Sequence, residues 1–364
     1  MMVCLATLDT LHAASQTPLR HEYPYAYRSA AFLGRGDAGL AIADDEDAIF
    51  YNPAGVARGK GIFKRAVFLS PMIEMSQSAR DLANRIGVQG SDPTDTLREQ
   101  VGKPQHLGMN AFSGLVMRRA ALGLYVHGRN TGYVFKDPDA GALETVYAHG
   151  VNDAGLAFAV AEDFGKRFRA GFTLRHMQRL EYFVNANVAE AQDAFTDTDS
   201  DQLAMQGTGT ALDVGVQFSF GRKRFASAYG LTIQDVGNTQ FAPAKSTTLA
   251  PAERPLQPTP QTVNLGAAWM VKSHVSEMKF LVDLRDVAGN TGLDHGKKLH
   301  LGTELNIAGL VGMVAGVNQG YPTAGFFLDL HVFRLDLGSY TEEVDSVAGQ
   351  RGDVRYYGRI FVGL

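Results

Sequence analysis

The sequence predicts an all-β protein: a transmembrane antiparallel β-barrel of about fourteen strands with an N-terminal plug, or hatch. Two observations lead to the barrel. After residue 60 the chain alternates polar and apolar residues over many short segments, and the connections between these segments are alternately tight and long. The tight connections are 118–119, 163–166, 221–223, 272–276, 308–309 and 333–334, and the long ones are 79–104, 137–144, 184–207, 237–260, 288–296, 319–322 and 344–352. Bacterial single-chain barrels place short turns in the periplasm and long loops outside, so we expect both ends of the barrel on the periplasmic side of the outer membrane.

The alternation places ionisable side chains on one face of four predicted strands, opposite a row of apolar side chains that can face lipid. The predicted lumen-facing polar residues are Arg167, Arg169, Arg175, Arg179, Glu181, Asp283, Arg285, Lys298, His300, Glu304, Asp329 and His331. Burying such groups in a dry sandwich core would cost several kcal/mol each, whereas a wet or plugged lumen lets opposite charges pair. The alternative is a soluble sandwich with these groups facing water. On the barrel interpretation, Leu301→Arg disrupts assembly and Glu304→Gln is tolerated.

The composition excludes several classes of protein. A helical membrane protein would show apolar runs of about 20 residues, and this chain, with a mean hydropathy of −0.10, contains none. The net charge of −4 argues against a nucleic-acid partner. The single cysteine, Cys4, cannot form an internal disulfide.

The N-terminal sequence divides the chain into three parts. Residues 1–14 resemble a truncated signal peptide with cleavage near Ala13 or Ala14, although a disordered tail is the alternative. Residues 15–60 do not alternate like the rest and form the predicted hatch, and residues 61–364 form the barrel.

A Gly-Ala-rich stretch, then Ala-Asp-Asp, then Asn-Pro-Ala-Gly, runs through residues 28–57. The residues that carry the pattern are Gly34, Gly36, Gly39, Ala43, Asp44, Asp45, Phe50, Tyr51, Asn52, Pro53, Ala54 and Gly55. Segments 301–305, 316–320 and 335–340, nearer the C-terminus, contribute to the same resemblance. This combination resembles the FadL-like outer-membrane family, including its PorV-like relatives, over nearly the whole chain.

The resemblance implies a hatch inside the barrel and uptake of long-chain fatty acids or other hydrophobic small molecules, which leave sideways at a kinked strand. A lumen this wide cannot be filled by wall side chains alone, which gives the hatch a physical reason. We expect the acidic residues 44–47 to meet lumen arginines such as Arg167, Arg169 or Arg175; a solvated turn is the alternative.

A kink is predicted where Gly128, Asn130 and Gly132 interrupt the third strand, since two glycines around polar residues favour a bulge. The alternative is a regular strand that tolerates glycine near the outer rim. An unbroken ladder of hydrogen bonds through Asn130 would remove this lateral exit.

The sequence indicates no enzyme, no cofactor and no metal site. It has no Gly-x-Ser-x-Gly elbow and no metal-ligand spacing of histidines or cysteines. Residues 197–201 resemble the start of a calcium loop, but an acidic surface loop is the simpler interpretation. Residues 92–101 have the features of a helix start, and the Pro-rich residues 237–260 are expected to be extended.

Three functions remain in competition: a channel for hydrophobic small molecules, a PorV-like partner of the secretion machinery, and a general porin. The hatch argues against the porin, because it would block aqueous flow. The expected partners are outer-membrane lipid and a hydrophobic ligand, with a secretion protein as the alternative.

Overall fold

The computed structural model describes residues 22–58, 63–86, 99–137, 143–165, 167–187, 204–222, 224–243 and 256–364. The strands are β1 Phe63–Leu69, β2 Met72–Ser76, β3 Gln105–Met117, β4 Ala120–Asp137, β5 Leu143–Phe164, β6 Phe168–Asn187, β7 Ala204–Arg222, β8 Phe225–Gln234, β9 Phe241–Pro243, β10 Thr262–Lys272, β11 Ser276–Leu284, β12 Leu299–Ile307, β13 Val311–Asn318, β14 Tyr321–Asp329, β15 Phe333–Glu343 and β16 Gly352–Gly363. The helices are α1 Ala30–Leu33, α2 Asp45–Tyr51, η1 Pro53–Ala57, α3 Gln77–Ile86 and η3 His295–Lys297. None of the helices in the described part of the chain is both long and apolar enough to cross a membrane.

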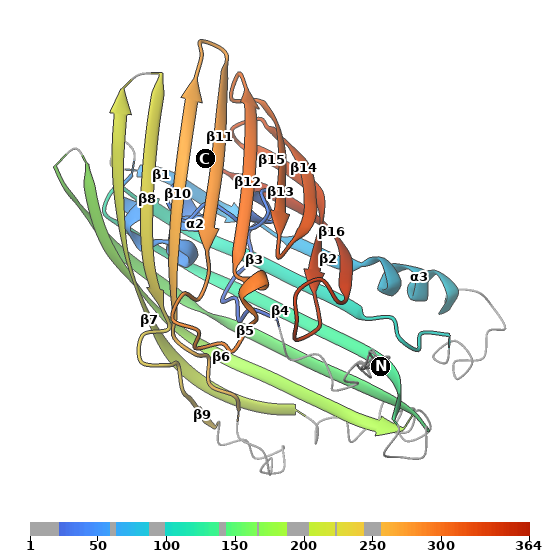
Figure 1. Ribbon diagram of the computed structural model, residues 1–364. Helices are drawn as coiled ribbons and strands as arrows, with labels where there is room; N and C mark the ends of the chain where they lie inside the picture. The colour runs from blue at the N-terminus through green and yellow to red at the C-terminus, as the bar shows by residue number, and fades with distance from the viewer. Residues whose placement is uncertain are drawn as a thin grey trace, which may run out of the picture.

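The strands close into one antiparallel barrel (Figure 1). Sixteen strands are present in the described ranges, but β9 lies beside β7 off the closed path, and β1 and β2 occupy one place between β16 and β3. The wall therefore has fourteen strands, and the predicted antiparallel barrel of about fourteen strands is confirmed.

Tight turns lie at one end of the barrel and longer connections at the other (Figure 1). Two predicted connections differ. The turn expected at 333–334 lies at 330–332, where His331 has a φ of 71°. The loop expected at 319–322 is a two-residue turn, because Gln319 and Gly320 both adopt positive φ values, 53° and 91°.

The wall is apolar outside and polar inside. On β12 the exposed side chains are Leu299, Leu301 and Ile307, whereas His300 and Glu304 are buried in the interior. The same alternation gives β11 the exposed Phe280 and the buried Asp283, and it recurs around the barrel. The outer face is therefore a lipid-facing belt.

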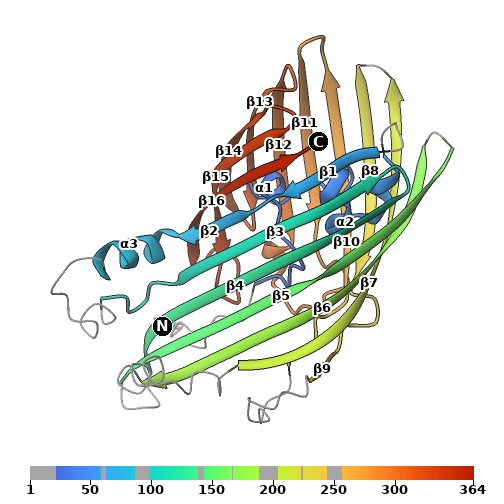
Figure 2. The ribbon, with the colours of Figure 1, turned by 180° about the vertical axis from the view of Figure 1, so that it is seen from behind.

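The wall is unequal around its circumference. Strands β4 to β7 have 18 to 22 residues, whereas β11 to β14 have 8 or 9. The long strands are strongly inclined against β10–β13 (Figure 2). Since about 9–11 residues suffice to cross a membrane, β4–β7 extend past the apolar belt toward the long loops.

The predicted kink at Gly128–Gly132 is wrong. Asn130 pairs with Leu107 on one side and Gly150 on the other, and both ladders are continuous. A Cβ on Gly128 would lie 2.6 Å from Oδ1 of Asn152, so this glycine makes room for a side chain of the next strand. No lateral exit exists at this position.

The wall is interrupted elsewhere, at Ser70–Pro71 between β1 and β2. Val67 pairs with Gly114 and Met72 pairs with Asn110, so residues 68–71 face residues 111–113 without ladder pairs. Proline has no N–H to donate, and only its carbonyl is used, by the N–H of Ile360 at 3.0 Å. The β16 side of the interruption is therefore bonded, and the β3 side is open.

Some predictions fall on residues outside the described ranges: the signal peptide at 1–14, the helix start at residues 92–98, the acidic loop at 197–201 and residues 244–255 of the Pro-rich loop.

The face assignment predicts that Leu301→Arg, on the lipid side of β12, lowers the free energy of unfolding by about 2–4 kcal/mol. Leu310→Arg, in the tight turn between β12 and β13, is the matched control and is expected to cost about 0–1 kcal/mol. Denaturant unfolding in lipid vesicles measures both. Equal effects would contradict the assignment of faces.

Candidate functional site

The N-terminal segment, residues 22–58, lies against the inward faces of the strands (Figure 1). Two glycines allow its backbone to approach the wall and itself. Gly36 has a φ of 68°, and a Cβ there would lie 2.3 Å from the carbonyl oxygen of Leu301. A Cβ on Gly55 would lie 1.9 Å from the carbonyl oxygen of Ala43. Any larger residue would push the segment out of place.

Asn52 fixes the turn between α2 and η1. Its Oδ1 accepts from the N–H of Ala54 at 3.2 Å, and its Nδ2 donates to the carbonyls of Leu40 and Val216 at 3.1 Å each. Pro53 begins η1, where the missing N–H costs nothing. The Asn-Pro-Ala-Gly motif thus joins two turns of the segment to β7.

Wall side chains satisfy the backbone of the segment from several strands. Oδ2 of Asp283 on β11 accepts from the N–H groups of Gly39 and Leu40, at 2.8 and 3.0 Å. Further contacts of this kind come, among others, from Thr173, Gln217, Gln234, His300 and Thr323. These residues lie on β6, β7, β8, β12 and β14, so the segment is held from many sides.

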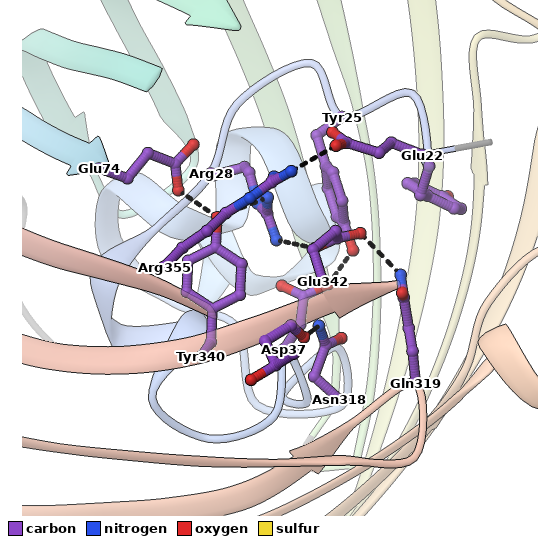
Figure 3. Close-up of polar contacts among 12 residues, drawn as sticks. Glu22, Tyr25, Arg28, Asp37, Glu74, Asn318, Gln319, Tyr340, Glu342 and Arg355 are labelled. Atoms are coloured by element: carbon purple, nitrogen blue, oxygen red, sulfur yellow. Dashed lines mark hydrogen bonds and ion pairs between the residues drawn. The ribbon is translucent and has the colours of Figure 1, made fainter. Parts of the chain in front are cut away.

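Arg28 is the centre of a buried network (Figure 3). Its guanidinium donates to Oε2 of Glu342 and to the hydroxyl of Tyr340, both at 3.0 Å. The Tyr340 hydroxyl donates to Oε2 of Glu74 at 2.7 Å. The guanidinium also lies over the rings of Tyr25 and Tyr340, at 4.5 and 4.7 Å. Removing this cation would take a neighbouring positive charge from two buried carboxylates, those of Glu342 and Glu74.

Glu22 ties the start of the segment to the wall. It pairs with Arg355, which also binds Asp353 at 2.7 Å, and it lies 3.6 Å from Arg129. Burial alone would raise the pKa of Glu22, but Arg355 and Arg129 outweigh it and hold the pKa well below its usual value. Glu22 is therefore a carboxylate at neutral pH.

Two further ion pairs join the segment to the wall. Arg35 donates to Glu304 at 2.8 Å, and Glu304 also binds Lys279 at 2.7 Å. Arg285 lies 3.5 Å from Oδ2 of Asp37 and also donates to the carbonyl of Asp37 at 2.9 Å. Glu304 is thus a buried partner of two cations, so the tolerance expected for Glu304→Gln no longer follows, because the substitution removes a charge that both cations need.

The acidic residues 44–47 meet different arginines from those predicted. Asp45 lies 3.2 Å from Arg65 on β1, and Glu46 lies 3.6 Å from both Arg65 and Arg359. The three predicted arginines lie elsewhere. Arg167 lies in an exposed turn, Arg169 pairs with Asp163, and Arg175 pairs with Asp213 and Asp235. The sequence fixes neither the depth of α2 nor its rotation, and both decide these partners.

Burial raises the pKa of Asp45 to about 7, with Asp44 and Glu46 adding to the effect against Arg65 and Lys64. Burial likewise raises the pKa of Asp47 to about 6, and Glu46 adds to it. The first half of α2 therefore holds carboxyl groups that change charge near neutral pH.

The structure brings most of the predicted lumen residues together. Those buried or half-buried on inward faces are Arg169, Arg175, Arg179, Glu181, Asp283, Arg285, Lys298, His300, Glu304 and Asp329. Arg167 and His331 are exceptions, because both lie in tight turns and are exposed to solvent.

A cavity of about 230 Å³ lies between the segment and β4–β6, on the long-loop side. Its lining is half polar and half apolar. Wall residues are His127, Arg129, Thr131, His149, Val151, Arg175, Met177, Arg179 and Glu181, and Glu22, Pro24, Tyr25, Ala26, residues 257–260 and Thr291 complete it. Arg179 and Glu181 both hold the 257–260 stretch: Arg179 donates to Thr259 at 3.2 Å, and Glu181 accepts from Gln257 at 3.2 Å.

Sequence reasoning missed His127, Arg129 and His149. On β4 the exposed Leu122 and Leu124 alternate with inward positions that include His127 and Arg129, and His149 takes such an inward position on β5. The signal was therefore present in the alternation. Across the described residues, no group of three His, Cys, Asp or Glu side chains is arranged to hold a metal ion.

An apolar groove of about 600 Å³ lies on the outer face beside the interruption at Ser70–Pro71. It is lined by Leu69, Ala111, Phe112, Ser113, Leu124, Tyr125, Val126, Ala154, Gly155, Leu156, His176, Gln178 and Thr208. Tyr125 also reaches inward, because its hydroxyl lies 3.4 Å from Sδ of Met177, which lines the inner cavity. One layer of side chains separates the groove from the cavity at this point.

No protein-family model and no curated protein sequence matches this chain. Among solved structures, it is similar to the toluene transporter TbuX of Ralstonia pickettii, with a TM-score of 0.51 and 8% identity over 93% of this chain and 99% of that chain. It is also similar to CymD, a monoaromatic hydrocarbon channel, with a TM-score of 0.52 and 9% identity over 94% and 98% of the two chains. The likeness is one of fold, and it confirms the fold that the FadL-like resemblance implied.

Burial of the segment predicts that Ala54→Cys, in a Cys4→Ser background, resists a bulky membrane-impermeant maleimide, because Ala54 is fully buried. Adding Arg28→Met breaks a buried ion pair at a cost of about 3–5 kcal/mol and is expected to speed the labelling. Ser273→Cys, in an exposed turn, is the control that labels rapidly in both backgrounds. Identical shielding with and without Arg28 would contradict its role as an anchor.

The raised pKa of Asp45 predicts a pH dependence. A carboxyl whose folded-state pKa lies above its unfolded value contributes stability below the unfolded pKa of about 4 and loses it as the pH rises through about 7. The barrel should therefore resist denaturant better at pH 5 than at pH 8. Asp45→Asn should reduce that difference, which denaturant midpoints in vesicles would measure, and an unchanged difference would count against it.

Proposed function

We propose that this barrel is an outer-membrane channel for hydrophobic small molecules, long-chain fatty acids among them, with residues 22–58 as its plug. The likeness in fold to a toluene transporter and a monoaromatic hydrocarbon channel supports the proposal. The apolar belt around a closed wall supports the membrane location. No catalytic step belongs to this function.

The contacts of residues 22–58 support their role as the plug. Backbone contacts to six strands and the ion pairs of Glu22, Arg28 and Arg35 hold the segment across the lumen. The segment stands between the inner cavity and the tight-turn end, where α2 meets Arg65. A molecule from the long-loop side would meet the segment before it reached the periplasm.

The position of Tyr125 carries the proposal. This side chain lines the lipid-facing groove and contacts Met177 of the inner cavity, so it belongs to the one layer of side chains between the two. Below the cavity, the segment contributes Tyr27 and Phe50, whose ring centroids are 4.4 Å apart. Phe50 contacts Tyr125 at 5.1 Å and Phe112 at 5.9 Å, and both of these wall residues line the groove. An apolar molecule that displaced this aromatic layer would leave sideways, beside the open edge of β3 at residues 111–113.

The mixed lining of the cavity supports ligands that combine an apolar body with a polar group. Val151, Met177 and Pro258 supply the apolar part, and Arg129 supplies a cation beside them. A fatty acid has this combination, whereas toluene would use the apolar part alone.

A structural partner in protein export is the second candidate. The dense ion pairing of the lumen and the continuous ladder of β4 favour it, since both oppose a wide passage. Under this hypothesis the barrel is a fixed body and transports no small molecule.

The route predicts that Ala111→Trp, which fills the outer groove, lowers uptake of labelled toluene and labelled oleate at least several-fold. The matched control is Ala315→Trp, an outward alanine of β13 remote from the groove in the strand order. Uptake is measured in a Gram-negative host that lacks its own channel for these compounds, and heat-modifiable gel mobility verifies folding. Normal uptake by Ala111→Trp would exclude this route, and no uptake by the folded wild type would favour the export partner.

A further inference from the structure

Among the described residues, the exposed basic side chains at the tight-turn end of the barrel form a row along one side of it. Four neighbouring turns contribute, between β3 and β4, β5 and β6, β7 and β8, and β10 and β11. The residues are Arg118, Arg119, Arg167, Arg224, Lys272 and His274, all exposed, and we call them the basic rim. Figure 1 shows these turns at the end opposite the long loops. The remaining tight turns, 308–310 and 330–332, contain His331 as their one ionisable residue.

Most of this charge is not neutralised within the protein. Arg119 pairs with Glu162 at 3.0 Å and Lys272 with Glu277 at 3.0 Å, but the cations remain 62% and 52% exposed. Ion pairs of this kind are weak because water screens them. In the described part of the chain, Arg118 and Arg224 have no ion-pair partner. The rim therefore has a positive excess that faces outward.

Exposed aromatic side chains lie directly beside the basic rim. The half-buried Phe168 contacts the exposed Phe164 at 5.6 Å and the exposed Phe218 at 4.8 Å between ring centroids. The guanidinium of Arg167 lies 5.8 Å from the ring centroid of Phe220. Phe225, next to Arg224, is 67% exposed. Aromatic rings at the strand ends of a barrel mark the membrane interface, so the basic rim lies at the depth of lipid headgroups.

We propose that the basic rim binds the phosphate groups of anionic phospholipids in the leaflet at the tight-turn end. Arginine side chains can lay their methylene stems along the aromatic girdle and keep the guanidinium at the phosphate level. Guanidinium groups bind phosphate with two parallel hydrogen bonds. The site is distinct from the plug and the groove, and it does not depend on transport.

An acidic protein is the competing occupant, and the aromatic residues favour lipid. The rings continue the apolar belt of the wall without a break, since Phe218, Tyr229 and Trp269 are exposed on the same strands. A protein docked on the turns would leave these rings in lipid beside it, whereas a phospholipid fits both: its acyl chains contact the rings and its phosphate meets the arginines.

The test compares two triple variants of the full chain in nanodiscs of equal parts phosphatidylglycerol and phosphatidylcholine. The rim variant is Arg118→Gln, Arg167→Gln and Arg224→Gln. The matched control removes three exposed cations from the long-loop side: Arg80→Gln, Lys103→Gln and Lys136→Gln. Native mass spectrometry counts the phospholipids that stay bound after release from the nanodisc.

The wild type and the control should retain phosphatidylglycerol in preference to phosphatidylcholine, and the rim variant should lose that preference at least several-fold. High salt should weaken the preference of the wild type, because it screens exposed charges. Equal retention by the rim variant and the wild type would overturn the proposal. A wild type that shows no preference between the two lipids would also overturn it. Binding of an acidic periplasmic protein by that wild type would favour the competing occupant. If the triple variant fails to fold, Arg118→Gln and Arg224→Gln alone decide the matter, each expected to lower the preference.

Discussion

Backbone pairing in lipid is the constraint on which the rest of this structure depends. A hydrocarbon layer offers no partner for an N–H or a carbonyl, so a sheet that crosses it must close on itself. Here closure joins the first wall strand to the last: Val67 pairs with Gly363, and the N–H of Ala66 donates to the carbonyl of Leu364 at 2.7 Å. A closed wall of fourteen strands encloses a space wider than its own side chains can fill. The need for residues 22–58, and for the polar groups that hold them, follows from that width.

Filling the lumen with a chain segment creates a second problem, because the backbone of the segment must be satisfied too. More than half of it is not helical, so many of its N–H and carbonyl groups need partners on the wall. Asp283 and Gln217 each serve two of these groups, and Thr173 and Thr323 serve one each. Asp283, Arg285, His300 and Glu304 are thus committed to the segment, whereas the other predicted lumen residues within the barrel pair with neighbouring wall residues. The mixed cavity near Arg129 is a part of the lumen where polar side chains still face open space.

The sequence predicted the wall better than the lumen, for a physical reason. Alternation with a period of two is a local property, and it identified both faces of β12 and the inward Asp283 and Glu304. The partners of Asp45 and Glu46 depend on how deep α2 sits, which no local pattern records. The kink prediction at Gly128 was wrong because this glycine makes room for the side chain of Asn152 on the next strand. The sequence alone does not distinguish such a glycine from one that bends a strand. His127 and Arg129 obeyed the alternation and could have been found by applying it to both faces of β4.

The interruption at Ser70–Pro71 is a place where the backbone pairing of the wall is incomplete, and it lies beside the outer groove. Backbone groups left without ladder pairs in lipid are costly, so such a break persists only where something compensates for it. The N–H of Ile360 uses the carbonyl of Pro71, and the hydroxyl of Ser113 donates to the carbonyl of Val67 at 3.3 Å. Behind the break, the buried rings of Phe112 and Phe50 pack against each other on the inner side of the wall. The aromatic layer that closes the proposed route thus also lies behind the break, so displacement of that layer by a ligand would change the surroundings of the backbone at residues 68–71. An apolar molecule offers these groups no hydrogen bond, so selectivity of the proposed route for apolar compounds has to come from the apolar lining of the groove and not from the unpaired backbone.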